Sequence, residues 1–144
     1  MTDWLPSGVI TITTDFGHKG PFAAVMPGVI TKRFPDARII DLAHDIPAHW
    51  PPEAGFWLSR SYPYFPDGTV HIAIVDPGVG TEREIIVAQK DRHVFIAPDN
   101  GLLAPILEKA ERICRLAQNR LAEQGLGKSS PTFQGRDIFA PVAA

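Results

Sequence analysis

The sequence predicts an α/β fold, a three-layer α/β/α sandwich around a largely parallel sheet. Short β-branched runs alternate with longer helix-favouring stretches, the order typical of parallel sheets whose crossovers are helices. The strand centres are apolar, as expected for strands covered on both faces. A chain of 144 residues is long enough for one domain with a proper core and too short for two full ones. We therefore expect a single domain over residues 1–144.

The first half of the chain predicts two strand-helix units. Residues 9–14 alternate apolar and hydroxyl side chains, which favours a strand. A mostly apolar helix is expected over residues 21–34, because Pro21 suits a first helical turn. A second strand is predicted at residues 38–42, and a second helix at residues 53–61 after a proline-broken loop.

The second half predicts the remaining strands and two short helices. Further strands are expected at residues 69–75, 85–88, 93–97 and 112–116. The middle two are predicted to pair as a hairpin around residues 90–92. Helices are expected at residues 102–108 and 138–144.

Composition excludes several classes of partner. The chain has 14 basic and 16 acidic residues, a formal charge of −2, and no long block of either sign, which argues against nucleic acid and against a basic membrane-binding face. No apolar run approaches a membrane span, and the first residues do not resemble a signal peptide. The single cysteine, Cys114, is expected to be a small buried apolar residue. We expect a cytoplasmic protein.

A loop at residues 43–52 contains His44, Asp45 and His49, which raises the question of a metal site. Two histidines five residues apart in a proline-rich loop match no common ligand spacing. We expect solvated loop histidines and no metal.

Polar residues follow several predicted strands. Asp15 follows the first, Asp76 with nearby Arg83 follows the strand at 69–75, and Asn100 follows a later one. If they meet at the carboxyl edge of the sheet, they form a polar pocket beside glycine turns. A carboxylate can accept hydrogen bonds from two ribose hydroxyls, and an arginine can stabilise an anion. Asp, Pro and Gly are also ordinary turn residues, so the segment DPGVG at residues 76–80 is equally consistent with a plain turn without a site.

Four motifs together resemble the S-adenosylmethionine hydroxide adenosyltransferases, hydrolases related to the fluorinating and chlorinating enzymes. The motifs are TDFG at 14–17, DPGVGTER at 76–83, APDNGLL at 97–103 and TFQGRDIFAP at 132–141. The resemblance implies an amino-terminal α/β/α domain. It also implies that water attacks the ribose C5′ of S-adenosylmethionine and methionine leaves, giving adenosine, with no cofactor besides the substrate. A dinucleotide-binding domain is disfavoured, because no GxGxxG follows the first strand.

The resemblance assigns water activation to an Asp, an Arg and a His. The first two fall on Asp76 and Arg83, and the third position holds Gln134. Glutamine can orient a water but cannot take its proton near neutral pH. The halogenating relatives carry tyrosine and threonine where this chain has Asp76 and Val79, which favours a hydrolase.

The resemblance also implies substrate-binding residues. Asp15 matches the family's ribose-binding aspartate, whereas a second family aspartate is Gly20 here. Trp50 falls near a pocket aromatic of the halogenating relatives, and a loop tryptophan packed on the surface is an equally good interpretation. The remaining expected contacts are Asn100, Phe133 and Gly135.

Family members continue into a carboxyl-terminal β-barrel domain and assemble as homotrimers, with each site between two subunits. The present sequence stops where that domain would begin, so the resemblance implies half a site. Two functions follow. One is hydrolysis of S-adenosylmethionine; the other is a weak or inactive module that binds adenosine or S-adenosylmethionine.

Overall fold

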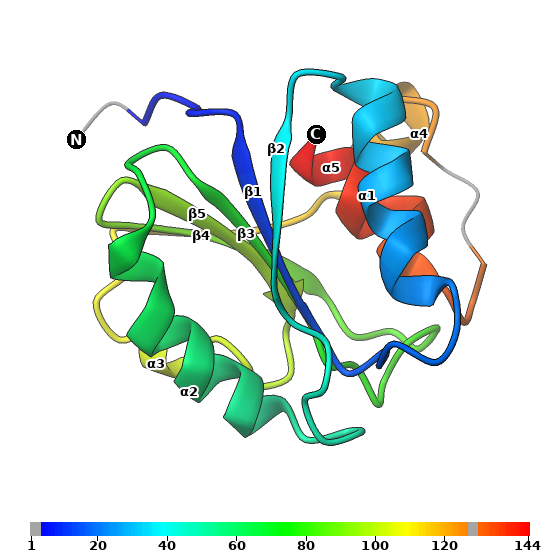
Figure 1. Ribbon diagram of the computed structural model, residues 1–144, viewed down its shortest axis with the longest axis horizontal. Helices are drawn as coiled ribbons and strands as arrows, with labels where there is room; N and C mark the ends of the chain where they lie inside the picture. Colours follow the sequence, from blue (N-terminus) through cyan, green and yellow to red (C-terminus); the bar gives the residue numbers. More distant parts are fainter. Residues whose placement is uncertain (1–3, 127–129) are drawn as a thin grey trace.

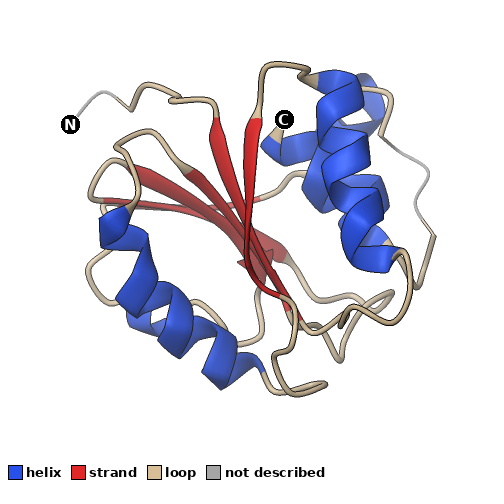
Figure 2. Cartoon of the chain, viewed as in Figure 1, coloured by secondary structure: helices blue, strands red, loops and turns tan. Residues whose placement is uncertain are grey.

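The computed structural model describes residues 4–126 and 130–144, which form one six-stranded sheet with helices on both faces (Figure 1 and Figure 2). The strands are β1 (Val9–Thr14), β2 (Arg38–Ala43), β3 (Val70–Ile74), β4 (Ile85–Lys90), β5 (His93–Pro98) and β6 (Arg112–Arg115). The helices are α1 (Phe22–Arg33), α2 (Pro51–Ser61), α3 (Ala104–Leu107), α4 (Gln118–Glu123) and α5 (Ala140–Ala143), with a 3-10 turn η1 (Tyr62–Tyr64) and a π-helical segment η2 (Gly135–Phe139).

The strand order is β2-β1-β3-β5-β4-β6. The first four strands in that order are parallel, and β4 runs antiparallel to both of its neighbours. The predicted hairpin is confirmed, because β4 and β5 pair from Lys90 and His93 across a two-residue turn. Asp91 and Arg92 in that turn have φ values of 50° and 64°, the left-handed conformation that a tight hairpin turn requires. The predicted α/β fold with a largely parallel sheet is confirmed.

Helices cover the two faces of the sheet unequally. Figure 1 shows α1, α4 and α5 on one side and α2 and α3 on the other. Because side chains alternate along a strand, β3 contributes to both cores. Ile72 packs in the core with Met26 of α1, and Ala73 packs in the opposite core with Leu58 of α2. The central strands are therefore buried on both faces, as their apolar sequences predict.

Several element boundaries differ from those predicted. Helix α2 begins at Pro51 rather than at residue 53, since prolines fit the first turn, where backbone N–H groups lack helical partners. The helix predicted from residue 138 begins at Gly135 as η2. Helix α4 was not predicted, because its sequence is polar and lacks a clear apolar period.

Cys114 is only half-buried, which corrects the expectation of a buried residue. The reason is its position on β6, a strand at the edge of the sheet. Each helix in the described part of the chain falls short of the length and apolar content needed to cross a bilayer.

Candidate active site

The carboxyl ends of β1 and β3 meet at one edge of the sheet, because the two strands are parallel neighbours. Asp15 directly follows β1, and Asp76 follows β3 after one intervening residue. Both aspartates line a cleft of about 170 Å³. The full lining is Asp15, Phe16, His49, Ile74, Asp76, Val79, Thr132, Phe133, Gln134, Gly135 and Phe139. The predicted convergence of polar residues at this edge therefore includes Asp15, Asp76 and Gln134.

Asp76 and Arg83 form a buried ion pair across the DPGVG turn. The Arg83 Nε donates to Oδ1 and Oδ2 of Asp76 at 3.1 and 2.9 Å, and Nη2 also donates to Oδ2. The two side chains are only 4% and 11% exposed. A guanidinium that binds both carboxylate oxygens fixes the plane of the carboxylate. The spacing of seven residues thus produces a rigid pair.

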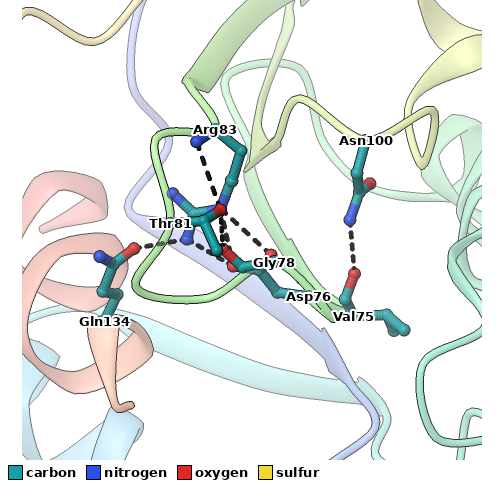
Figure 3. Close-up of polar contacts among 7 residues, drawn as sticks. All are labelled: Val75, Asp76, Gly78, Thr81, Arg83, Asn100 and Gln134. Atoms are coloured by element: carbon teal, nitrogen blue, oxygen red, sulfur yellow. Dashed lines mark hydrogen bonds and ion pairs between the residues drawn. The ribbon is translucent and has the colours of Figure 1, made fainter. Parts of the chain in front are cut away.

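Gln134 completes a three-residue cluster. Its side-chain oxygen accepts a hydrogen bond from the same Arg83 Nη2 that binds Asp76 (Figure 3). Gln134 directly precedes η2 and lies 51 residues from Arg83 in sequence, so the contact depends on the tertiary fold. The three residues that the family motifs assign to the attacking water are in contact, with Arg83 between the other two.

Two glycines near the cluster are closely packed, one in the turn and one at the start of η2. Gly80 has φ 80°, and a Cβ on it would lie 2.3 Å from the carbonyl oxygen of Pro131. A Cβ on Gly135 would lie 3.3 Å from Ile74, Met26 and Phe16. A larger residue at Gly80 would push the turn away from Pro131, and one at Gly135 would press on the side chains of Ile74, Met26 and Phe16.

Asp15, which directly follows β1, also lines the cleft. It is partly buried, and its Oδ2 accepts the backbone N–H of His49 at 3.0 Å. His49 adopts φ 60°, which turns this N–H toward the carboxylate. His49 is exposed, as expected, yet its place in the cleft was not predicted. No spacing rule indicates a backbone donor of this kind.

Phe133 forms an aromatic wall of the cleft. Its ring contacts Phe16 and Phe22 edge to face, with centroids 5.7 and 5.5 Å apart. The Arg136 guanidinium lies 5.1 Å from the Phe133 ring centroid, which adds a cation–π contact. The wall therefore links the turn after β1 to the segment that carries Gln134.

Asn100 and Trp50 lie outside the cleft lining. The Asn100 amide donates to the carbonyl oxygen of Val75 at 2.8 Å (Figure 3). Its side-chain oxygen accepts the N–H of Leu102 at 3.1 Å. Asn100 thus braces the backbone next to Asp76. Trp50 precedes α2 and is 58% exposed.

His44 corrects the expectation of solvated loop histidines. It is 2% exposed and its ring nitrogens contact Thr14 and Asp41, so it is a structural part of the sheet edge. Within the described residues, no group of three or more His, Cys, Asp or Glu side chains is arranged to hold a metal ion.

Comparisons with known proteins show the family of this chain. A family model described as SAM hydroxide adenosyltransferase N-terminal domain matches residues 10–144. An (R)-S-adenosyl-L-methionine hydrolase from Thermus thermophilus is 40% identical over 137 residues, covering 91% of this chain and 53% of that protein. A protein of the same name from Methanocaldococcus jannaschii is 37% identical, with coverages of 94% and 52%. The chain therefore spans about half the length of the curated relatives it matches.

More distant and structural relatives agree as well. A fluorinase from Actinopolyspora mzabensis is 21% identical, covering 100% of this chain and 56% of that protein. A crystal structure of an uncharacterized conserved protein from Thermotoga maritima superposes with a TM-score of 0.85 and 38% identity, covering 93% of this chain and 51% of that chain. With its fold, its four motifs and the family match over residues 10–144, this chain belongs to the SAM hydroxide adenosyltransferase N-terminal domain family.

Proposed function

We propose that this protein contributes the amino-terminal half of a site that hydrolyses S-adenosylmethionine to adenosine and methionine. The observation that carries the proposal is the contact of Arg83 with both Asp76 and Gln134, in a cleft that Asp15 also lines. The printed names of the Thermus and Methanocaldococcus relatives support the same substrate.

The reaction requires little beyond positioning. A bond forms between the water oxygen and C5′ while the C5′–S bond breaks. The bonding electron pair goes to sulfur, so methionine leaves as a neutral thioether, and the water releases one proton. The sulfonium is already a good leaving group. The main task is to hold the water about 3 to 3.5 Å from C5′, away from bulk solvent.

In this proposal Asp76 accepts a hydrogen bond from the attacking water, and Arg83 fixes the orientation of the carboxylate. Gln134 orients the water through its amide. Asp15 accepts hydrogen bonds from the ribose hydroxyls through the oxygen that His49 leaves free.

The remaining assignments concern binding and support. Phe133 and Gly135 form the wall against which the nucleoside lies. Asn100 supports Asp76 through its hydrogen bond to Val75. Trp50 covers the pocket in the assembled protein.

The whole protein is proposed to be larger than this domain. By the family resemblance, a carboxyl-terminal β-barrel domain supplies the adenine and methionine contacts, and a cytoplasmic homotrimer places each site between two subunits. No cofactor is required, because S-adenosylmethionine is itself the activated substrate.

A second candidate function is binding of adenosine or S-adenosylmethionine with little or no turnover. Gln134 favours it, because an amide in contact with Arg83 cannot accept the water's proton. Loss of general-base assistance typically lowers a rate by about 10² to 10⁴-fold without abolishing binding.

The test is incubation with S-adenosylmethionine, for this chain and for the longer protein if the coding region continues, followed by chromatography of adenosine and methionine. Equal amounts of both products, abolished by Asp76→Ala, are expected for the hydrolase. Adenosine binding that Asp15→Ala abolishes, without products, would instead support the binding module. Neither binding nor products, even with Gln134→His, would overturn both functions.

A further inference from the structure

A one-residue irregularity in the pairing of β2 with β1 lies beside a contact between Asp41 of β2 and His44, the first residue after that strand. Ile12 of β1 pairs with Asp41, and the next residue, Thr13, pairs with Ala43, so Leu42 is the extra residue. In a regular strand, residues three apart point to opposite faces. Here the Asp41 Oδ1 lies 2.8 Å from the Nε2 of His44. Bulges of this kind re-aim side chains next to functional sites.

His44 is held at both ring nitrogens. Its side chain is 1% exposed, and its Nδ1 lies 2.7 Å from the hydroxyl of Thr14. The Thr14 oxygen also accepts the backbone N–H of Phe16 at 3.1 Å. The carbonyl oxygen of His44 accepts the N–H of Gly17 at 2.7 Å. Side chain and main chain of His44 thus bind both sides of the turn that contains Asp15.

If the His44 imidazole is neutral, only one assignment of donors and acceptors satisfies the hydrogen bonds from Thr14 through His44 to Asp41. The Asp41 carboxylate can only accept, so the Nε2 of His44 carries the proton and Nδ1 is an acceptor. The hydroxyl of Thr14 then donates to Nδ1, and its oxygen is free to accept from Phe16. The Thr14 hydroxyl and both ring nitrogens of His44 are buried and each has a partner, which is the condition for a rigid network.

We propose that His44, oriented by Asp41, is a positioning residue that fixes the Asp15 carboxylate for the two hydroxyls of a ribose. The inference rests on the proposed function, because Asp15 is assigned there to the substrate ribose. The sequence analysis did not predict the contact between Asp41 and His44, which lies where the pairing of β1 with β2 shifts its register. His44 acts through Thr14 and the turn and does not touch the substrate.

Two adjacent threonines supply a matched pair of variants. Thr13 and Thr14 are both 0% exposed, and within the described residues the Thr13 hydroxyl has no hydrogen-bond partner. Thr14→Val is expected to weaken adenosine binding about tenfold, the equivalent of one hydrogen bond, whereas Thr13→Val leaves it unchanged. Thr14→Ser, which keeps the hydroxyl, is expected to restore binding.

The two ring nitrogens of His44 can be tested separately. An asparagine amide occupies roughly the place of Nδ1, and a glutamine amide roughly that of Nε2. His44→Asn is therefore expected to retain the bond to Thr14 and most of the adenosine affinity, and His44→Gln to lose both. Asp41→Ala, at a side chain 55% exposed, is expected to weaken binding in the same direction without loss of folding.

A comparison of two ligands separates positioning from mere stabilisation of the fold. The tenfold loss in Thr14→Val is expected for adenosine and absent for 2′,3′-dideoxyadenosine, which lacks the hydroxyls that Asp15 would bind. An equal loss for both ligands, or equal affinity of Thr14→Val and Thr13→Val for adenosine, would overturn the inference and leave the proposed function intact. Absence of adenosine binding by the unmodified chain would overturn the inference together with the ribose assignment on which it rests.

Discussion

Arg83 donates a hydrogen bond to the side-chain oxygen of Gln134 while its guanidinium binds both carboxylate oxygens of Asp76. The position at which the family motif carries a histidine therefore remains part of the cluster. Gln134 contacts Arg83 and lacks the capacity to accept a proton.

Replacing Gln134 by histidine is expected to raise the rate of adenosine formation from S-adenosylmethionine. A general base contributes about 10² to 10⁴-fold when it lies within reach of the reacting water. The measurement is the initial rate of adenosine release, compared with Gln134→Leu as a control that also removes the amide. Equal rates for the histidine and leucine variants would show that position 134 takes no part in proton transfer.

Arg83→Met is expected to lower the free energy of unfolding by about 3 kcal/mol, because it leaves the carboxylate of Asp76 buried without its partner. Arg92→Met is the matched control, since the pair of Arg92 with Asp67 is 57% and 63% exposed. That control is expected to change the free energy by less than about 1 kcal/mol. Urea unfolding of both variants measures the difference, and equal effects would contradict the buried ion pair.

Thr13→Val is expected to increase the free energy of unfolding by about 1 kcal/mol. The hydroxyl of Thr13 is fully buried and has no hydrogen-bond partner in the described part of the chain, so a methyl group of the same shape removes an unsatisfied polar atom. Thr14→Val removes a hydrogen-bonded hydroxyl one residue away and is expected to decrease the free energy of unfolding. Thermal unfolding of both variants checks this, and a shift of the same sign in the two would contradict it.

Stability is expected to fall as the pH falls below about 6.5, because burial lowers the pKa of His71 to about 3. The ring is hydrogen-bonded to Thr11 and His93, and the pKa of His93 is also lowered by burial. The unfolded chain takes up a proton below the usual histidine pKa, and the folded chain does not. The stability from neutral His71 is therefore full above that pKa and is lost toward pH 3.

The measurement is urea unfolding at several pH values between 7.5 and 4.5. One histidine contributes at most about 1.4 kcal/mol for each pH unit in this range. His71→Leu is expected to show a smaller slope than the unmodified chain. An unchanged slope would show that His71 is not the group responsible.

The fold and the positions of Asp15, Asp76 and Arg83 could be predicted, because they depend on sequence patterns and on the direction of the strands. Apolar runs such as residues 69–75 mark the strands, and carboxylates that follow parallel strands, such as Asp15 and Asp76, must meet at one edge. Asp76 and Arg83 could be assigned together because the family resemblance implies both residues, at a spacing of seven. These features are set by sequence neighbours or by the direction of the sheet.

The contacts of His44, His49 and Asn100 depend on the tertiary fold, which local sequence patterns do not contain. His44 is buried between Thr14 and Asp41, beside the point where the pairing of β1 with β2 shifts its register, and no propensity indicates this position. The role of His49 is a backbone N–H at positive φ, independent of its side chain. Asn100 was expected at the substrate, and the structure places it on the carbonyl oxygen of Val75, because an amide can bind backbone as well as ligand.

Isotope labelling of the product tests the central claim most directly. The longer protein, if the coding region continues, and its Gln134→His variant would be incubated with S-adenosylmethionine in water enriched in oxygen-18, and the adenosine formed would be analysed by mass spectrometry. The account predicts one solvent oxygen in the 5′ hydroxyl of adenosine, with methionine unlabelled and in equal amount. Unlabelled adenosine, or no adenosine from either protein, would contradict it.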